Sequence, residues 1–498
     1  MKFKSSIAKP YASIVSKRIR NGMNTAVSDQ QNILSKLLQV GGKTTFGNDH
    51  HLAEVKNHLQ YKQAVPIRDY EKLKPYVEQI IEGKQNILWK GKPLYFAKTS
   101  GTTSGAKYIP ITKDSMPNHI NSAKNMLLCY IAETGNASFV DGNMIFLSGS
   151  PVLERTGSVP TGRLSGIVNH FVPNYLRRNQ LPSYETNCIE DWETKLERIV
   201  AETLGKNMTL ISGIPPWVQM YFDWLMEKSD GKKIMEIFPN LQLLVQGGVN
   251  FEPYKEKLLQ SVGRKIDILE TFPASEGFFA FQDTLEAEGM LLNTNSGIFF
   301  EFIPVGEVFD ENPTRLSLED VKVGENYALI INSNAGLWGY NIGDTVKFVS
   351  TDPYRVIVSG RIKHFISAFG EHVIGEEVEK AMLQTAQKHN AKIIEFTVAP
   401  MVQTDNELPF HEWFVEFEKE PNDIAEFSSD LDNNLRALNT YYNDLVKGSI
   451  LQPLIIRQMQ PHSFIEYMKS IGKLGGQNKV PRLTNDRKLA DELQQWKQ

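Results

Sequence analysis

Cysteine is scarce in this chain. Only Cys129 and Cys188 occur among 498 residues, and they are far apart in the sequence. Their separation matches none of the short spacings that bind metals or form redox pairs. Both lie among apolar or mixed neighbours, which favours buried free thiols. The pattern therefore predicts a reducing, cytoplasmic compartment.

Long hydrophobic runs and a strong charge of one sign are also missing. No run of 18 or more apolar residues is present to span a membrane, and the N-terminus lacks the apolar core of a secretory signal. The net charge of −4 gives no electrostatic footprint for nucleic acid. Residues 1 to about 23 form a basic amphipathic segment that could lie on a membrane surface. Packing against its own domain is the favoured interpretation, so we expect neither a membrane nor a nucleic-acid partner.

Familiar catalytic and nucleotide-binding motifs are absent. There is no Gly-x-Gly-x-x-Gly, which argues against a dinucleotide-binding fold. No Gly-x-Ser-x-Gly elbow falls at a strand-to-helix turn, and no Walker A loop is present. The hydrophobic content of 41% and the charged content of 22% are ordinary for a soluble globular protein. At this length, two or three domains are expected.

The most informative stretch lies between two apolar runs at residues 94–96 and 108–111, which predict strands around a tight loop. Glycine lets the backbone approach a ligand closely, and consecutive N–H groups with hydroxyls form an anion-binding nest. The lysine adds a point charge suited to phosphate. The loop predicts a polyphosphate clamp, with an ordinary surface turn as the alternative. Its candidate residues are Thr99, Ser100, Gly101, Thr102, Thr103 and Lys107.

This loop resembles the ATP-phosphate loop of acyl-adenylating enzymes, the superfamily of firefly luciferase and the acyl-CoA ligases. The following Tyr108-Ile109-Pro110 and the later motifs resemble the auxin-responsive acyl-acid amido synthetases. The resemblance points to a bacterial member of that family and covers nearly the whole chain. It implies an N-terminal ATP- and acyl-binding domain over residues 1–359 and a smaller mobile domain over 360–498.

The hydrophobic pattern predicts an α/β fold independently. The pattern of residues 1–90 predicts helices. After the loop, apolar residues at helical spacing predict a helix that begins near Asp114 or Ser115. Strands at 208–211, 243–246 and 266–269 alternate with helices, which indicates a largely parallel sheet. Short strands after residue 290 predict a small β-barrel-like subdomain. Beyond residue 360 the pattern predicts helices at 376–389, 430–445 and 462–470 and strands at 393–398, 410–417 and 454–456.

Two motifs follow predicted strands, where ligands of parallel sheets bind. Gly247-Gly248 resembles the glycine turn that lies beside adenine in adenylating enzymes, although an ordinary turn explains it as well. Phe272-Pro273-Ala274-Ser275-Glu276 resembles the family's aromatic-x-Ser/Ala-Ser-Glu motif. An aromatic ring can cover a base, a hydroxyl can meet phosphate, and a carboxylate can hold Mg²⁺. A helix start capped by Ser275 is the alternative. The resemblance assigns nucleotide contacts to Thr271, Phe272, Ala274 and Ser275, and the metal to Glu276.

Three further segments complete the expected site. Tyr340-Asn341-Ile342-Gly343-Asp344 resembles the family's Tyr-Arg-x-Gly-Asp, which makes Asp344 the ribose-binding candidate, although Asn341 replaces the arginine. Gly360-Arg361 resembles the hinge, with Arg361 as a nucleotide contact. Gly476 to Arg482 resembles the Gln-Tyr-Lys-x-Pro-Arg signature, with Asn478 in place of tyrosine. Lys479 is the favoured catalytic lysine because Pro-Arg follows it, and Lys473 is the rival.

The irregular stretch from 155 to 190 contains many glycines and prolines, and such a stretch often builds a ligand pocket. Arg163, His170 and Arg177 lie there and could meet a carboxylate, or they could simply be solvated.

The resemblance implies a two-step reaction that uses ATP and Mg²⁺. A small carboxylic acid is adenylated, and an amine, expected to be an amino acid, then displaces AMP. A thiol acceptor, as in acyl-CoA ligases, and a non-catalytic nucleotide-binding protein of the same fold remain alternatives. The sequence identifies neither the acid nor the amine.

Overall fold

The computed structural model describes residues 3–100, 106–172, 177–248, 251–308, 310–362, 365–366, 373–402, 408–447, 450–474, 479–484 and 486–498. The chain folds into two compact units. Unit 1 comprises Met1–Ile342 with Val346–Val358, and unit 2 comprises Gly343–Thr345 with Ser359–Gln498. The roles that the sequence assigns to the two domains stay predictions.

Unit 1 begins with a layer of helices, as the sequence predicts for residues 1–90. They are α1 (Phe3–Met23), α2 (Ala26–Gly41), α3 (Thr45–Asp49), α4 (His58–Ala64) and α5 (Tyr70–Ile81). Side chains of Asn57 and Asp69 cap α4 and α5 by accepting hydrogen bonds from the backbone N–H groups of the first turn. No helix in the described ranges has both the length and the apolarity to cross a bilayer.

A four-stranded sheet follows the helical layer. Its strand order is β2 (Ala106–Ile111), β1 (Tyr95–Ser100), β5 (Val159–Gly162), β4 (Glu154–Thr156). β1 pairs antiparallel with β2 and parallel with β5. The five-residue loop between β1 and β2 is the predicted phosphate loop.

The larger sheet has eleven strands, and its order is β12-β13-β14-β15-β11-β10-β9-β8-β7-β3-β6. In this sheet, the neighbouring strands β9, β8, β7, β3 and β6 pair in parallel. The bounds along this order are Ile298–Pro304, Asn326–Ser333, Tyr340–Thr351, Tyr354–Arg361, Met290–Leu292, Gly277–Phe281, Asp267–Ala274, Leu243–Gly247, Met208–Gly213, Asn143–Phe146 and Gln180–Leu181.

The strands after residue 290 are hydrogen-bonded into the large sheet, and the small β-barrel-like subdomain that the sequence predicts stays a prediction. In β12, Phe299 and Phe300 are both buried although successive side chains point to opposite faces. A strand with both faces covered gives a continuous apolar run whether it lies in a barrel or in a covered sheet. The sequence pattern alone therefore could not separate the two.

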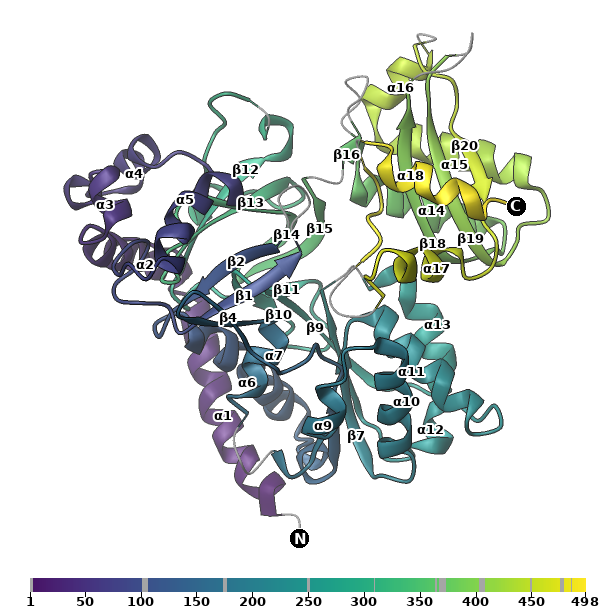
Figure 1. The fold of residues 1–498 in the computed structure, drawn as a ribbon, viewed down its shortest axis with the longest axis horizontal. Helices are drawn as coiled ribbons and strands as arrows, with labels where there is room; N and C mark the ends of the chain where they lie inside the picture. The colour runs from purple at the N-terminus through teal and green to yellow at the C-terminus, as the bar shows by residue number, and fades with distance from the viewer. Residues whose placement is uncertain are drawn as a thin grey trace. The chain divides into compact units, whose positions relative to one another are not determined.

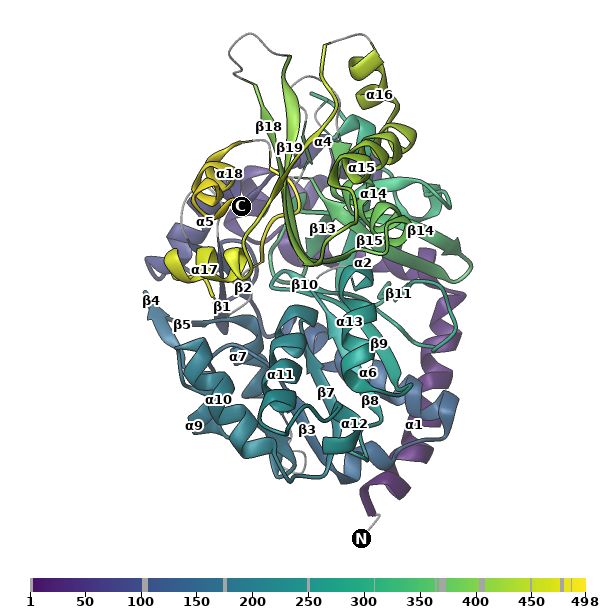
Figure 2. The same cartoon turned by 90° about the vertical axis from the view of Figure 1, so that its right-hand side faces the viewer.

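Helices cover both faces of the parallel part of this sheet (Figure 1). α1 and α6 (Met116–Thr134) lie on one side, where they pack with Leu210, Leu243 and Val245. On the other side lie α10 (Trp192–Thr203), α11 (Pro215–Glu227), α12 (Ile234–Ile237) and α13 (Glu252–Val262), which stand in front of β7 in Figure 2. The short helices α7 (Leu164–Asn169) and α9 (Tyr184–Asn187) belong to the irregular stretch. The predicted helix after the phosphate loop is confirmed, since α6 follows Ser115.

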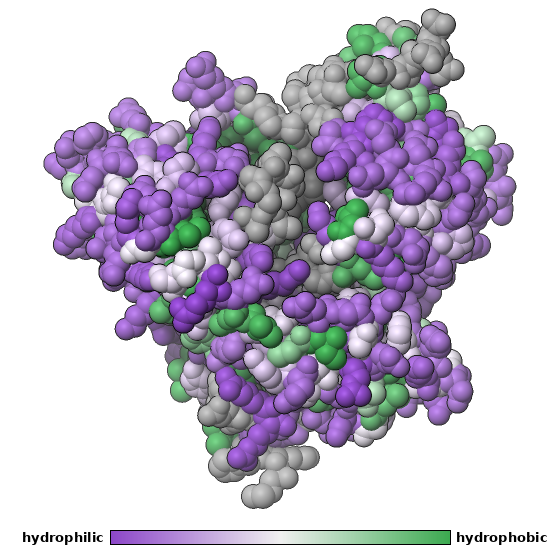
Figure 3. Space-filling view, viewed as in Figure 1, coloured by the Kyte–Doolittle hydropathy of each residue, from purple (hydrophilic) through white to green (hydrophobic). Residues whose placement is uncertain are grey.

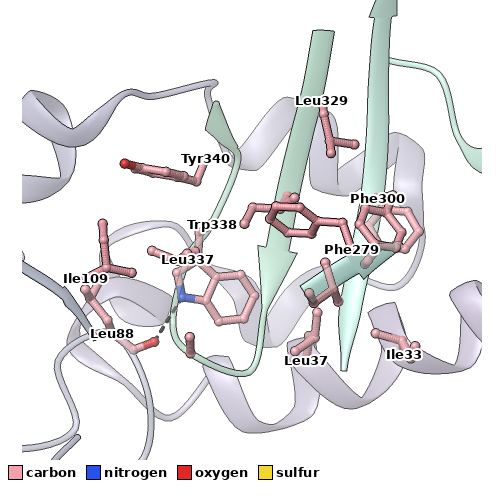
Figure 4. Packing of buried hydrophobic residues seen from close by; sticks show 14 of the residues in the cluster. Ile33, Leu37, Leu88, Ile109, Phe279, Phe300, Leu329, Leu337, Trp338 and Tyr340 are labelled. Carbon is pink, nitrogen blue, oxygen red and sulfur yellow. Dashed lines mark hydrogen bonds between the residues drawn. The ribbon is translucent and has the colours of Figure 1, made fainter. Parts of the chain in front are cut away.

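The main core of unit 1 joins α2 and α5 to both sheets. Trp338 lies at its centre, and its indole N–H donates to the Leu88 carbonyl at 2.9 Å (Figure 4). Of the two free cysteines, Cys129 is buried, which raises the pKa of its thiol to about 12, whereas Cys188 is half-buried. The molecular face in Figure 3 is mostly hydrophilic, with hydrophobic groups scattered over it.

Unit 2 is a smaller α/β unit built on the sheet β18 (Lys392–Met401), β19 (Phe410–Lys419), β20 (Ile455–Gln458). The short strands β16 (Phe365–Ile366) and β17 (Val373–Ile374) pair with each other. Its helices are α14 (Gly375–Lys388), α15 (Ile424–Leu438), α16 (Thr440–Lys447), α17 (Ser463–Ser470) and α18 (Lys488–Leu493).

The single helix predicted over 430–445 is wrong, because α15 and α16 are separate helices. Asn439 between them has extended backbone angles of φ −124° and ψ 109°. Its side-chain oxygen accepts a hydrogen bond from the Tyr442 N–H at 2.8 Å, which caps the start of α16.

Candidate functional site

The β1–β2 hairpin brings two of the predicted phosphate-binding residues opposite each other. Thr99 pairs with Lys107, and Ser100 pairs with Ala106. Gly101, Thr102 and Thr103 lie outside the described residues. Thr99 and Lys107 therefore stand opposite each other where the loop begins and ends.

Helix α5 supports the second strand of this hairpin. The Tyr70 hydroxyl accepts a hydrogen bond from the Tyr108 N–H at 2.9 Å, and the Lys107 ammonium lies 5.8 Å from the centre of the Tyr70 ring. Tyr70 is buried, which raises the pKa of its phenol and keeps it neutral. The contact with the ring restrains Lys107 beside the loop.

The predicted glycine turn meets the aromatic motif at the ends of two parallel strands. Gly247 of β8 pairs with Thr271 of β9, and the Thr271 hydroxyl donates to the Gln246 carbonyl at 3.0 Å. A Cβ on Gly247 would overlap the Thr271 hydroxyl, so only glycine fits there. Gly248 has φ +87°, the left-handed conformation that glycine favours. The structure thus brings Gly247, Gly248 and Thr271 together at the carboxyl edge of the sheet.

Ser275 and Glu276 form a two-residue turn between β9 and β10. Ala274 pairs with Gly277 directly across the turn, so the alternative of a helix start capped by Ser275 is wrong. Ser275 is buried and Glu276 is half-buried at the tip. Phe272 lies in the core of unit 1, where its ring packs edge-on against Phe279 at 5.1 Å. With an exposed fraction of 5%, Phe272 supports the hairpin from inside.

Side chains from outside the sheet hold this turn. Asn118 of α6 accepts a hydrogen bond from the Phe278 N–H at 2.7 Å and donates to the Phe278 carbonyl at 3.1 Å. Asn293 donates to the same carbonyl at 3.2 Å. The pairing of β9 with β10 is irregular between Phe278 and Ala280. The asparagines therefore bond the backbone where the ladder is disturbed, two residues beyond Glu276.

In unit 2, the ribose candidate lies next to the hinge candidate. The Ile362 N–H donates to the Gly343 carbonyl at 2.6 Å, and the Ser359 hydroxyl donates to the Thr345 hydroxyl at 3.0 Å. Asp344 and Arg361 therefore occupy neighbouring positions on adjacent chain segments. Gly360 has φ +156°, a conformation that side-chain-bearing residues rarely adopt.

The segment after Lys479 is hydrogen-bonded to β18. The Val398 N–H donates to the Arg482 carbonyl at 2.9 Å, and the Thr484 N–H donates to the Val398 carbonyl at 2.9 Å. Arg482 also forms ion pairs with Glu379 and Glu395. Lys479 itself is exposed, as is the rival Lys473, which directly follows the turn after α17. The Pro-Arg part of the signature thus anchors the chain beside Lys479.

Two of the three candidates in the irregular stretch hold the loop itself. His170 Nε2 lies 2.9 Å from the Pro151 carbonyl, and Arg177 donates to the carbonyls of Val172 and His170. These contacts are structural. Two features of the site were not predicted from the sequence. They are the asparagine contacts to Phe278 and the buried Lys195, which lies on the apolar face of α10 beside Leu196 and Ile199. A lysine within an apolar stripe at helical spacing was the signal available for it.

The described residues contain no group of three or more His, Cys, Asp or Glu side chains that could hold a metal ion. Magnesium in nucleotide sites needs only one or two carboxylates, because phosphate oxygens and water supply the other ligands. A single half-buried Glu276 at the carboxyl edge of the sheet fits that requirement.

Three models of one family match the chain in order. The GH3 family N-terminal domain matches residues 15–170, the central domain 291–360 and the C-terminal domain 376–488. The chain belongs to the GH3 family. The predicted membership of the acyl-acid amido synthetase family is confirmed.

Relatives and solved structures agree with this placement. Jasmonoyl–L-amino acid synthetase JAR4 of Nicotiana attenuata is 22% identical, over 64% of this chain and 66% of its own length. Jasmonoyl–L-amino acid synthetase GH3.5 of Oryza sativa subsp. japonica is also 22% identical, over 92% of both chains. The structure of the GH3.15 acyl acid amido synthetase matches with a TM-score of 0.80 and 15% identity, covering 97% of this chain and 96% of that one. A 2-hydroxyisobutyryl-CoA ligase with its adenylate matches with a TM-score of 0.60 and 13% identity, covering 93% and 91%. The expected α/β fold, with a large N-terminal and a smaller C-terminal domain, is confirmed.

Proposed function

We propose that this GH3 protein is an acyl acid amido synthetase, which adenylates a carboxylic acid with ATP and transfers the acyl group to an amino acid. The observation that carries the proposal is the match of all three GH3 domains in their family order. The names of relatives that align over nearly the whole chain support it, since they are amide-forming synthetases.

The reaction balances in two steps. A carboxylate oxygen attacks the α-phosphorus of ATP, the bond to the β-phosphate breaks, and pyrophosphate leaves. The amine nitrogen then attacks the acyl carbon, AMP leaves with the bridging oxygen, and the amine loses a proton. The protein contributes by orienting the carboxylate in line and by balancing charge on the phosphates.

Each part of the nucleotide is assigned to one of three groups of residues in the site. Thr99, Lys107 and the loop between them are assigned to the phosphates. The edge formed by Gly247, Gly248 and Thr271 is assigned to the adenine side. Asp344 and Arg361 in unit 2 are assigned to the ribose and its surroundings. The positions of the first two groups in unit 1 and of the third in unit 2 support these roles.

Magnesium is assigned to Glu276. When bound, the ion would neutralise charge on the ATP phosphates. The hairpin fixes the backbone of Glu276, and the hydrogen bonds to Phe278 restrain that hairpin. The protein residues therefore set where the carboxylate stands before the nucleotide arrives.

Lys479 is assigned to the α-phosphate. A lysine there counters the charge that builds as the acid attacks. The anchored residues 481–484 support Lys479 over Lys473, because they fix the chain two positions away. Domain closure about Gly360 would then separate the two half-reactions.

Three finer points belong to the same proposal. The acceptor is an amino acid and not coenzyme A, as the names of the relatives suggest. The compartment is the cytoplasm, and two free cysteines are in keeping with it. The source is bacterial, which rests on the resemblance of the sequence motifs alone.

The test is a pyrophosphate-release screen with ATP and Mg²⁺. The acids include jasmonic acid and indole-3-acetic acid, after the named relatives, and each is tried with the standard amino acids and with coenzyme A. We expect pyrophosphate and AMP as products and an amide that carries the amino acid. ADP with orthophosphate, or a thioester formed in preference to an amide, would contradict the proposal.

A further inference from the structure

Two cationic side chains meet at the carboxyl edge of unit 1. Arg163 directly follows β5, and Gly162 before it pairs with Ala97 of β1. Arg163 therefore begins beside the part of β1 that enters the phosphate loop. The aliphatic part of the Arg163 side chain also packs against Gly149, because a Cβ added to Gly149 would lie 2.7 Å from Arg163 Cδ. Gly149 follows β3, so Arg163 spans the small sheet and the large one.

The guanidinium of Arg163 has no hydrogen bond or ion pair within the described residues. It is half-buried. Burial lowers its pKa, and no carboxylate contributes an opposing effect. A guanidinium offers five N–H donors, and burying its charge without a partner is costly. This differs from His170 and Arg177, which bond to loop carbonyls.

Lys195 of α10 adds a second charge behind Arg163. It is buried, and its ammonium donates to the carbonyls of Ser148 and Asn187, both at 2.9 Å. Burial lowers the pKa of Lys195 to about 8. Cys188 opposes this shift, and the charge of Arg163 adds to it. The two cations repel each other, and no described carboxylate lies between them. A bound anion would offset this repulsion.

The reaction offers three anionic groups. The phosphates have their own loop with Lys107. The carboxylate of the acyl acid must keep a lone pair for attack on phosphorus, and it loses its charge once the adenylate forms. The carboxylate of the amino acid keeps its charge from binding to release. Arginine stays charged, and its planar guanidinium can donate two parallel hydrogen bonds to a carboxylate. It therefore suits the carboxylate of the amino acid best.

We propose that Arg163 binds the carboxylate of the amino-acid acceptor and that Lys195 is a positioning residue, which holds the loop after β3 against Arg163. The proposal rests on the amide-forming activity described above. Arg163 would then distinguish amino acids from amines that lack the carboxylate.

The test compares an amino acid with its own carboxamide, using the acid and amino acid selected by the screen. The variant is Arg163→Gln, with Arg163→Lys as a charge-retaining variant. Arg155→Gln is the matched control, because Arg155 is exposed on β4 in the same small sheet. Acid-dependent ATP–pyrophosphate exchange reports the first half-reaction and shows that each variant is folded.

We expect Arg163→Gln to raise the KM for the amino acid about 10- to 100-fold, of the size that loss of a charge-assisted hydrogen bond gives. The KM for the carboxamide and the pyrophosphate exchange should stay unchanged, so the preference for the carboxylate disappears. Arg163→Lys should keep part of that preference. An equal rise for both acceptors, an unchanged KM, or slowed exchange would overturn the assignment. If the wild-type protein exchanges pyrophosphate but makes no amide, the proposed function fails instead.

Discussion

Two acidic residues of unit 1 differ in how deeply they are buried. Glu301 is fully buried, and it accepts hydrogen bonds from His58, Arg315 and Asn332. Arg315 binds both of its oxygens. Glu276 is instead half-buried, in the turn between β9 and β10. Residues of the first kind maintain the fold, and residues of the second kind are the candidates for chemistry.

Glu276→Gln keeps the shape of the turn and removes the charge assigned to Mg²⁺. We expect at least a ~100-fold loss in pyrophosphate exchange, of the order seen when one electrostatic group in a transition state is removed. The melting temperature should not change. Glu286→Gln, at an exposed position beyond β10, is the control. Near-normal exchange at limiting Mg²⁺ would place the metal elsewhere.

Glu301 makes the fold sensitive to acid. Burial alone would raise its pKa, but the bond from His58 and the charge of Arg315 lower it from 4.5 to about 2. The ionised form therefore stabilises the protein fully above about pH 4.5, and this contribution is lost as the pH falls towards 2. Glu301→Gln should lower the free energy of unfolding at pH 7 by about 3–5 kcal/mol.

Urea unfolding at pH 7 and at pH 3 measures this effect. The loss of stability between the two pH values should be smaller in Glu301→Gln than in the wild-type protein. Glu311→Gln, which is exposed, should follow the wild type. Parallel losses in all three proteins would show that Glu301 is not the acid-sensitive group.

At the level of elements, α6 and the β9–β10 hairpin act as a pair. Asn118 bonds both backbone groups of Phe278, and a Cβ on Gly277 would meet the side chains of Ile298 and Phe279. The hairpin is thus fixed from the helix side and from the core. The turn that carries Glu276 owes its position to these contacts.

Asn118→Ala should therefore affect both stability and rate. It leaves the Phe278 N–H without its acceptor, which costs about 1–3 kcal/mol, and it should slow pyrophosphate exchange. Asn121→Ala, exposed on the same helix, is the control. Urea midpoints and exchange rates are measured together. A destabilised variant with undiminished exchange would show that the turn holds its place without Asn118.

Many of the helices and strands could be predicted from the sequence. The pattern of apolar residues predicted the helices α6 and α14, and the apolar runs predicted the strands β7, β8 and β19. Long-range pairing could not be read in this way. The addition of β12–β15 to the large sheet, the burial of Phe272 and the contact between Gly247 and Thr271 all depend on segments distant in sequence. The break at Asn439 was missed because its capping side chain competes with the helical pattern.

For the whole molecule, the question is which step uses Lys479. Lys479→Ala should cripple formation of the adenylate, because the charge on the α-phosphate would lose its partner. It should spare conversion of a pre-formed acyl-adenylate to the amide, since no such charge builds up then. Single-turnover kinetics of each half-reaction measure the difference. Lys473→Ala is the matched variant, also exposed and in the same unit.

The result for Lys473→Ala separates the two lysines. If that variant loses the first step and Lys479→Ala does not, the role belongs to Lys473. Equal slowing of both steps by Lys479→Ala would argue that the lysine serves the fold of unit 2 or a motion common to both steps.

The unequal burial of the two cysteines allows one of them to be labelled selectively. Cys129 is closed off by its surroundings, whereas Cys188 is half-buried beside Lys195. A thiol-directed fluorophore should therefore attach once per native chain, at Cys188, without any engineered cysteine. Its emission would report directly on amino acids arriving next to Arg163, and a titration could follow acceptor binding in the absence of turnover.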